Sequence, residues 1–287
     1  MKLQPPAELH SFTAVMAFCK LLTALVLIHC CGAVLGSEVR SSIIGGGNAN
    51  KGDWKWMVHL NISDGVNKRR CGGSILNKQW LLTAANCWER DPKPRADRSM
   101  AWIGAHDLHK ESERYMAIVF HMSHPGYQAV GGGFVSDLAL VKLQKKIGFS
   151  GLAGPVGLPS DGDTFDSSSE CWITGWGNIR PGVPLPPPET LQQLRISILP
   201  QNVCKEKYPQ MTAEQLCAGD LAGGKDACDG DYGGPLVCRK GAGFVQVGIM
   251  SYGSCGLAGR PGVYTRVSSY VDYIKTYINQ EEASAEV

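Results

Sequence analysis

The sequence predicts an all-β fold, because strand-like patterns recur along most of the chain. At 54–61 every second position is large and apolar, occupied in turn by Trp54, Trp56, Val58 and Leu60. This period of two is typical of a half-buried strand. Similar short runs occur at 74–76, 117–120, 138–143, 172–175, 194–199, 236–237, 245–251 and 262–267, separated by turns rich in Gly, Pro and Asp. Many short strands with frequent turns indicate a barrel or a sandwich.

The length and the remaining segments indicate two halves and one terminal helix. The chain has 287 residues, of which 44% are hydrophobic, enough for a large core. A stretch rich in Gly, Pro and Ser at 148–166 interrupts the strands and suits a connection between the halves. Apolar residues at helical spacing predict a helix at about 268–278: Val267, Tyr270, Val271, Ile274, Tyr277 and Ile278. The acidic segment 279–287 is expected to be disordered.

The N-terminal segment has the features of a secretory signal. An apolar run at 21–36 follows Lys20 and ends in the small residues Val34 and Gly36, which predicts a cleaved signal peptide at 1–36. A signal anchor is the alternative, but the run is short for a bilayer span, which needs roughly 20 apolar residues. Residues 37–42 then form a short propeptide or linker. We expect a protein without a stable membrane span that is extracellular or stored in secretory granules.

The cysteines favour a disulfide-bonded, secreted protein. Of the 11 cysteines, Cys19, Cys30 and Cys31 lie in the N-terminal segment, which leaves an even number downstream. Spacing alone leaves about a hundred pairings open. The chain lacks paired Cys-x-x-Cys units with suitable histidines, so we expect no metal and no cofactor. A net charge of +2 gives no sign of a nucleic-acid partner.

Two surface features stand out in the first half. Asn61 begins the chain's only N-glycosylation sequon, at an expected strand end, and predicts an attached glycan in a secreted protein. Lys68, Arg69 and Arg70 form a small basic cluster. We interpret this cluster as a solvated loop, with binding of a polyanion such as heparin as the less favoured alternative.

Five segments carry a family resemblance. They are Ile-Ile-Gly-Gly at 43–46, the cysteine-bounded segment 71–87, Asp-Leu-Ala-Leu-Val-Lys-Leu at 137–143, the segment 171–177 and Asp-Ala-Cys-Asp-Gly-Asp-Tyr-Gly-Gly-Pro-Leu-Val-Cys at 226–238. In order and spacing they resemble the trypsin/chymotrypsin-like serine proteases (peptidase S1) over about 43–278, with 185–194 similar to the tryptase, prostasin and testis-type branch. The resemblance implies two six-stranded antiparallel β-barrels, about 43–150 and 160–266, with the active-site cleft between them and a C-terminal helix.

The resemblance also implies a catalytic triad, of which this chain keeps one member. Asn86 stands where the family has its general-base histidine, and Tyr232 stands where it has the nucleophilic serine. A carboxamide cannot accept a proton at neutral pH, and the tyrosine oxygen lies at the far end of a rigid ring. Asp137 matches the acid that orients the histidine; we expect it to be structural here, hydrogen-bonded to Asn86 and to Ser251. In subtilisin, losing the serine or histidine alone lowers turnover on the order of 10⁶-fold.

The substrate-binding positions are better kept. By the resemblance, Asp226 is the acid at the floor of the primary pocket in members that prefer Arg or Lys, and Gly253 and Gly262 leave its walls open. Ser251 lies in an edge segment that pairs with an extended peptide. A groove for a basic peptide is one interpretation; the other is that the Tyr232 ring fills the mouth of the pocket.

The resemblance assigns two further pairs of residues. The N–H groups of Gly230 and Tyr232 form the oxyanion hole. Proteolysis before Ile43 frees an amine that pairs with Asp231. The preceding residue, Ser42, is unsuited to tryptic activation, so activation either needs an unusual protease or further trimming, or does not happen. The implied disulfides use all eight remaining cysteines and join Cys71–Cys87, Cys171–Cys238, Cys204–Cys217 and Cys228–Cys255.

These observations predict a catalytically inactive serine protease homologue that is secreted and acts by binding a protein or peptide, as a decoy, cofactor or scaffold for an active protease or its inhibitor. A trypsin-like endopeptidase that cleaves after Arg or Lys by unorthodox chemistry is the first alternative. A purely structural matrix or coat component is the second.

Overall fold

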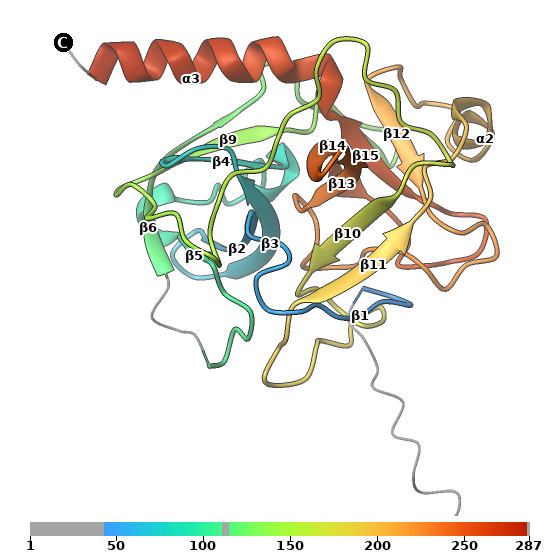
Figure 1. Cartoon of the computed structure of the whole chain (residues 1–287), viewed down its shortest axis with the longest axis horizontal. Coiled ribbons are helices and arrows are strands. Elements are labelled where there is room, and N and C mark those ends of the chain that lie inside the picture. Colours follow the sequence, from blue (N-terminus) through green and yellow to red (C-terminus); the bar gives the residue numbers. More distant parts are fainter. Residues whose placement is uncertain (1–42, 111–114, 286–287) are drawn as a thin grey trace, which may run out of the picture. The chain divides into compact units, whose positions relative to one another are not determined.

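The structure, a computed structural model, describes residues 43–110 and 115–285 (Figure 1). The predicted signal peptide at 1–36 and linker at 37–42 lie outside these residues, so both stay predictions. Within the described ranges, no helix combines the length and the apolar character needed to cross a bilayer.

The first half of the described chain is a closed antiparallel barrel. Its strands pair around the barrel in the order β2 (Met57–Ser63), β3 (Lys68–Ile75), β4 (Trp80–Thr83), β9 (Ala139–Leu143), β6 (Tyr115–Ser123) and β5 (Met100–Ile103). Closure leaves no unpaired edge. The interior is filled by apolar side chains such as Leu60, Leu82 and Leu140, all fully buried. The predicted six-stranded first barrel is confirmed.

Strand β2 is buried on both faces, whereas its alternating sequence predicted a half-buried strand beginning at Trp54. Residues 51–56 form turns, and only Asn61 of the strand is partly exposed. The second face is covered because His59 packs against Trp102, with ring centroids 5.6 Å apart, and against Trp176, 5.8 Å away. Trp176 belongs to the second half, so the interface between the halves buries this face.

The second half is a seven-stranded antiparallel sheet. The strands follow the order β1 (Gly47–Asn48), β11 (Gln192–Ile196), β10 (Cys171–Gly175), β13 (Pro235–Lys240), β14 (Gly243–Tyr252), β15 (Gly262–Arg266) and β12 (Gln215–Ala218). Beyond β11, Ile198 forms a bridge with Ala218, and Leu199 N donates to Cys217 O at 2.9 Å. These contacts join β11 to β12 and close six strands into the second predicted barrel, to which β1 is added. In the described chain, no strand lies between β9 and β10, where the sequence predicts a connection at 148–166.

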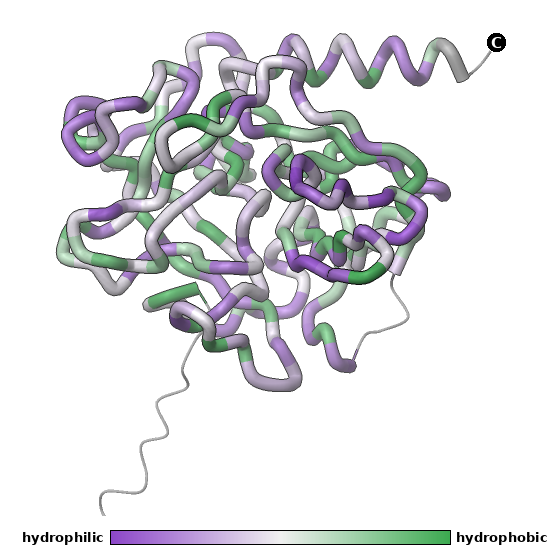
Figure 2. The backbone as a smooth tube through the Cα atoms, turned by 180° about the vertical axis from the view of Figure 1, so that it is seen from behind, coloured by the Kyte–Doolittle hydropathy of each residue, from purple (hydrophilic) through white to green (hydrophobic). Residues whose placement is uncertain are grey.

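The C-terminal helix is longer than predicted. After a 3₁₀ turn at Val267–Tyr270, α3 spans Val271–Ala285, so the expected disorder of 279–287 is wrong over 279–285. The last turns are held because Lys142 Nζ lies 3.3 Å from the Glu281 carboxylate and Asn77 Nδ2 donates to Glu282 at 3.0 Å. Polar and apolar residues alternate along this helix (Figure 2), and its Ile274 and Ile278 pack into the first barrel.

Several short elements were not predicted, because each is too short for a clear periodic pattern in the sequence. They include the strands β1, β4, β5 and β12, the 3₁₀ turns Ala85–Cys87 and Ala96–Arg98, the hairpin of β7 (Gln128–Val130) and β8 (Gly133–Val135), and the helix α2 (Gln201–Lys207). The sequon residue Asn61 lies two residues before the end of β2 and pairs with strands on both sides. Its glycosylation stays a prediction.

Candidate active site

Three loops bring the degenerate triad positions together where the halves meet. Asn86 lies in the 3₁₀ turn that follows β4, Asp137 lies just before β9, and Tyr232 lies in the turn that leads into β13. The contact between the halves is direct, because Gly72 N of β3 donates to Tyr232 O at 2.8 Å. A Cβ on Gly72 would lie 2.7 Å from Gly234 Cα, so only glycine permits this approach.

Asn86 and Asp137 form a buried hydrogen-bonded pair. Asn86 N donates to Asp137 Oδ1 at 2.7 Å, and the side-chain Nδ2 donates to Asp137 Oδ2 at 2.6 Å. Nδ2 also donates to Ser251 O at 3.1 Å, and Ser251 Oγ donates to Asp137 Oδ2. The structure thus shows the expected bonds of Asp137. It also places Ser251, expected at the peptide-binding edge, inside this network.

Burial controls the charge of Asp137. The side chain is fully buried, and this raises the pKa of its carboxyl to about 6, against the hydrogen bonds from Ser251 and Asn86, which lower it. At neutral pH the carboxyl is therefore an anion that accepts hydrogen bonds from Asn86 and Ser251. Its environment supplies amide and hydroxyl hydrogens in place of an imidazole.

Tyr232 packs against apolar residues of both halves. Burial, with a further contribution from Asp229, raises the pKa of its phenol to about 12. The hydroxyl is therefore protonated throughout the physiological range. Within the described part of the chain, the N–H groups of Gly230 and Tyr232 donate to no backbone carbonyl, as their assignment to an oxyanion hole requires. Gly230 has a φ of 99°, a conformation that favours glycine.

Arg69 is a member of the site that the sequence did not single out. Its Nη1 donates to Asn86 O at 2.8 Å, and its Nη2 donates to Asn86 Oδ1 at 3.3 Å. Its guanidinium carbon also lies 5.9 Å from the centroid of the Tyr232 ring, within the range of a cation–π contact. The solvated-loop interpretation of the basic cluster is wrong, because Lys68, Arg69 and Arg70 all lie in β3, and Arg69 is half-buried. The cluster was the only available sequence signal, and it gave no direction for the side chain.

Asp226 lies buried beside the two expected pocket glycines. It is 1% exposed, and its carboxylate accepts N–H groups from Gly256 at 3.0 Å and Ala227 at 2.9 Å. A Cβ on Gly262 would lie 2.6 Å from Asp226 Oδ1, and one on Gly253 would lie 3.3 Å from Oδ2. Burial raises the pKa of Asp226 to about 6. No basic side chain in the described ranges lies within ion-pair distance of this carboxylate.

The activation pair is buried in the second half. Ile43 is fully buried, and Ile44 pairs with Asp226 through backbone hydrogen bonds. The Asp231 carboxylate accepts N–H groups from Gly177 at 2.8 Å and Cys228 at 3.1 Å. Burial raises the pKa of Asp231 to about 7. A cationic amine beside this carboxylate would lower its pKa.

The comparisons with known proteins agree with this geometry. The family model described as Trypsin matches residues 43–274. The chain belongs to the trypsin family. It is 37% identical to mouse (Mus musculus) tryptase over 257 residues, 84% of this chain and 90% of the relative. It is 35% identical to coagulation factor XI of cattle (Bos taurus) over 246 residues, which cover 84% of this chain but only 38% of that protein.

The disulfides are those that the trypsin-family resemblance implies. The structure joins Cys71–Cys87, Cys171–Cys238, Cys204–Cys217 and Cys228–Cys255. In the described ranges, one group of side chains has the types that can ligate a metal: Cys228, Asp229 and Cys255. Both sulfurs belong to one disulfide and are therefore not thiolate ligands.

Four histidines of this trypsin-family chain make their contacts away from the Asn86–Asp137 pair. His59 is packed between tryptophans, and burial lowers its pKa to about 3. His121 stacks on Trp88 with centroids 4.0 Å apart, and His124 packs edge-on against Tyr273. His109 lies 3.6 Å from the Glu189 carboxylate. These four rings are therefore committed to contacts outside the Asn86–Asp137 pair.

Proposed function

We propose that this chain is a non-catalytic member of the trypsin family that acts by binding a protein or peptide segment. The observation that carries the proposal is the hydrogen bonding of Asn86. Its Nδ2 presents hydrogens to Asp137 and Ser251, and its one side-chain acceptor, Oδ1, faces the Arg69 guanidinium. The position that must accept a proton in peptide hydrolysis has no basic lone pair.

Tyr232 gives no substitute for the missing chemistry. A phenol with a pKa of about 12 is a poor nucleophile at neutral pH unless a base removes its proton. The nearest cation, Arg69, lowers this pKa but cannot accept a proton. No hydrogen bond joins the phenol to a base among the described residues, so hydrolysis by this tyrosine, the alternative function, lacks a positioned general base in the described site.

The binding part of the proposal rests on Asp226. A buried carboxylate that has no cationic side chain within ion-pair distance among the described residues, and that lies against two glycines where any larger residue would crowd it, favours a ligand with an Arg or Lys side chain. Such a segment occurs in substrates and inhibitors of trypsin-like proteases. We therefore propose that the protein is a decoy, cofactor or scaffold for an active protease or its inhibitor. Secretion and a glycan at Asn61 belong to this proposal, and the four disulfides support an oxidising compartment.

The test is binding of an arginine peptide to the full secreted chain. A fluorescein-labelled peptide with one Arg is titrated by fluorescence polarisation beside the same peptide with Gln. We expect saturable binding of the Arg peptide, weakened at least about tenfold in Asp226→Asn, and recovery of intact peptide by mass spectrometry. Asp272→Asn, in the first turn of α3, removes the same charge elsewhere and should change nothing.

Two results would contradict the proposal. Cleavage of the peptide by purified wild type, absent from Tyr232→Phe, would support the enzyme alternative. Equal binding of the Arg and Gln peptides, or no binding of either, would favour a structural component or a pocket blocked by Tyr232.

A further inference from the structure

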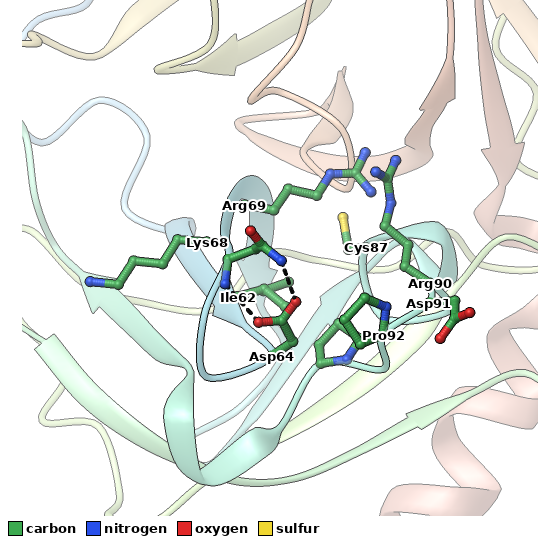
Figure 3. Close-up of a pocket in the computed structure, with 10 residues that line it drawn as sticks. Ile62, Asp64, Lys68, Arg69, Cys87, Arg90, Asp91 and Pro92 are labelled. Carbon is green, nitrogen blue, oxygen red and sulfur yellow. Dashed lines mark hydrogen bonds between the residues drawn. The ribbon is translucent and has the colours of Figure 1, made fainter.

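Two arginines meet at the edge of the degenerate site and line one cavity with a volume of about 290 Å³ (Figure 3). Arg69 comes from β3, and Arg90 comes from the segment after the 3₁₀ turn that contains Asn86. Figure 3 shows the two guanidinium groups turned toward one another, with Lys68, also a lining residue, pointing away.

The two guanidinium groups share one acceptor. Arg69 Nη1 donates to Asn86 O at 2.8 Å, and Arg90 Nε donates to the same oxygen at 3.3 Å. Burial and the charge of Arg90 lower the pKa of Arg69 to about 10. Among the described residues, neither arginine has a carboxylate within ion-pair distance. Each guanidinium carries five N–H donors, so both keep hydrogens available for an anion.

The acidic residues near this pair do not neutralise it. The Asp64 carboxylate is occupied by its own loop, where it accepts N–H groups from Val66 and Asn67, each at 2.7 Å. Asp91, at the cavity lining, directs its carboxylate away from the two guanidinium groups (Figure 3). Asp137 and Asp229 act on the pKa of Arg69 only from beyond ion-pair distance.

The same acids decide which anion fits. A long polyanion laid over this cavity would meet Asp64 and Asp91 as well as the arginines, and like charges repel. A single carboxylate meets only the two guanidinium groups, which match its geometry through paired N–H donors. The site therefore favours an Asp or Glu side chain over a sulfated glycan.

The arginine pair lies close to the proposed peptide site. The Arg69 guanidinium lies 5.9 Å from the centroid of the Tyr232 ring. The residue after Tyr232, Gly233, donates its N–H to Met250 O at 2.7 Å. The Met250 side chain and the Asp226 carboxylate both lie beside Gly253, where an added Cβ would be 3.1 and 3.3 Å from them. A short segment that crosses Tyr232 can therefore approach an anion at Asp226 and a cation at Arg69.

We propose that Arg69 and Arg90 bind a carboxylate side chain of the same peptide segment whose basic side chain is bound by Asp226. This inference rests on the proposed function and specifies its ligand: a segment that carries one Arg or Lys and, within a few residues, one Asp or Glu. The bound carboxylate accepts charge-assisted hydrogen bonds from both guanidinium groups, which without it face each other as two like charges.

The experiment uses paired peptides and the full secreted chain. Each labelled peptide has one Arg in an otherwise Ala/Gly sequence, and Glu is placed in turn at each position on either side. A matched peptide carries Gln at the same position. We expect Glu at one or two positions to lower the Kd about tenfold relative to Gln, with the advantage reduced at high salt.

Variants assign this advantage to the arginines. Arg90→Gln, an exposed position chosen to preserve folding, should abolish the difference between Glu and Gln peptides and leave the affinity of the Gln peptides unchanged. Arg69→Gln should also abolish the difference between Glu and Gln peptides, provided that its thermal unfolding matches wild type. Arg98→Gln removes the same charge from an exposed position outside the cavity and should preserve the difference.

The outcomes separate this inference from the proposed function. Equal Kd values for Glu and Gln peptides at every position, or an advantage that survives both arginine variants, would overturn the carboxylate site. Binding of the Gln peptides that depends on Asp226 would still support the proposed function. A heparin fragment that binds through Arg90 while Glu peptides gain nothing would show a polyanion site instead. No binding by any peptide would overturn both.

Discussion

Restoring the triad tests the role of Arg69 most sharply. The double variant Asn86→His/Tyr232→Ser supplies an imidazole and a hydroxyl beside the retained Asp137. Arg69 Nη2 now lies 3.3 Å from Asn86 Oδ1, so an imidazole at position 86 would stand close to a guanidinium. In serine-protease chemistry this imidazole becomes a cation in the transition state. We therefore expect the double variant to be hindered by Arg69.

The size of this effect follows from the separation of the two charges. Two unit charges about 4 Å apart at an effective dielectric constant of about 20 repel by about 4 kcal/mol. That energy corresponds to a factor on the order of 10³ in rate. Adding Arg69→Gln to the double variant should therefore raise kcat for a fluorogenic arginine substrate on the order of 10³-fold.

The assay needs material that begins at Ile43, verified by mass spectrometry, so that activation is not limiting. Arg98→Gln in the double variant is the matched control for removal of one positive charge. Equal rates for the double and triple variants would refute the proposed effect of Arg69. A folded but inert triple variant would show that other parts of the cleft have also lost their function.

Three further predictions follow from buried polar groups and the sequon. Asn86→Ala removes the Nδ2 bonds to Asp137 and Ser251 and should lower the free energy of unfolding by about 2–4 kcal/mol in denaturant titrations; a change below about 0.5 kcal/mol would contradict a structural role for Asn86. In the uncleaved chain, the raised pKa of Asp231, about 7 when folded against about 4 when unfolded, means that the native state retains a proton that the unfolded state loses. The free energy of unfolding of wild type relative to Asp231→Asn should therefore fall by about 4 kcal/mol from about pH 4 to about pH 8, measured by urea titration at each pH, and a rise over this window would be the contrary result. Asn61→Gln should abolish the gel shift produced by N-glycosidase in protein from mammalian cells, whereas a shift that persists would place the glycan elsewhere.

The β-rich halves were predictable because their signals are local. Alternating apolar residues and turn-forming residues identify strands without knowledge of their partners. The burial of β2 on both faces was not predictable, since the residue that covers His59 is Trp176, far along the chain. The helical end of the chain was also missed, because polar contacts of Glu281 and Glu282 with the first barrel hold it.

In the candidate site, too, some residues were predictable from the sequence and others were not. Motif positions placed Asn86, Asp137 and Tyr232 in one site, and the structure brings the first two into direct contact. Arg69 was visible only as part of a basic cluster. Its direction depends on the carbonyl of Asn86 and the ring of Tyr232, two groups that strand folding brings beside it. The sequence does not distinguish an arginine on the surface from an arginine in the site, because only tertiary contacts differ between them.

The central claim is that no group at positions 86 and 232 performs the proton transfer of peptide hydrolysis. The most direct measurement is turnover of fluorogenic Arg and Lys substrates by wild-type chain that begins at Ile43, compared with Tyr232→Phe, which loses only the hydroxyl. We expect no turnover above background in either protein. Wild-type turnover that disappears in Tyr232→Phe would contradict the claim.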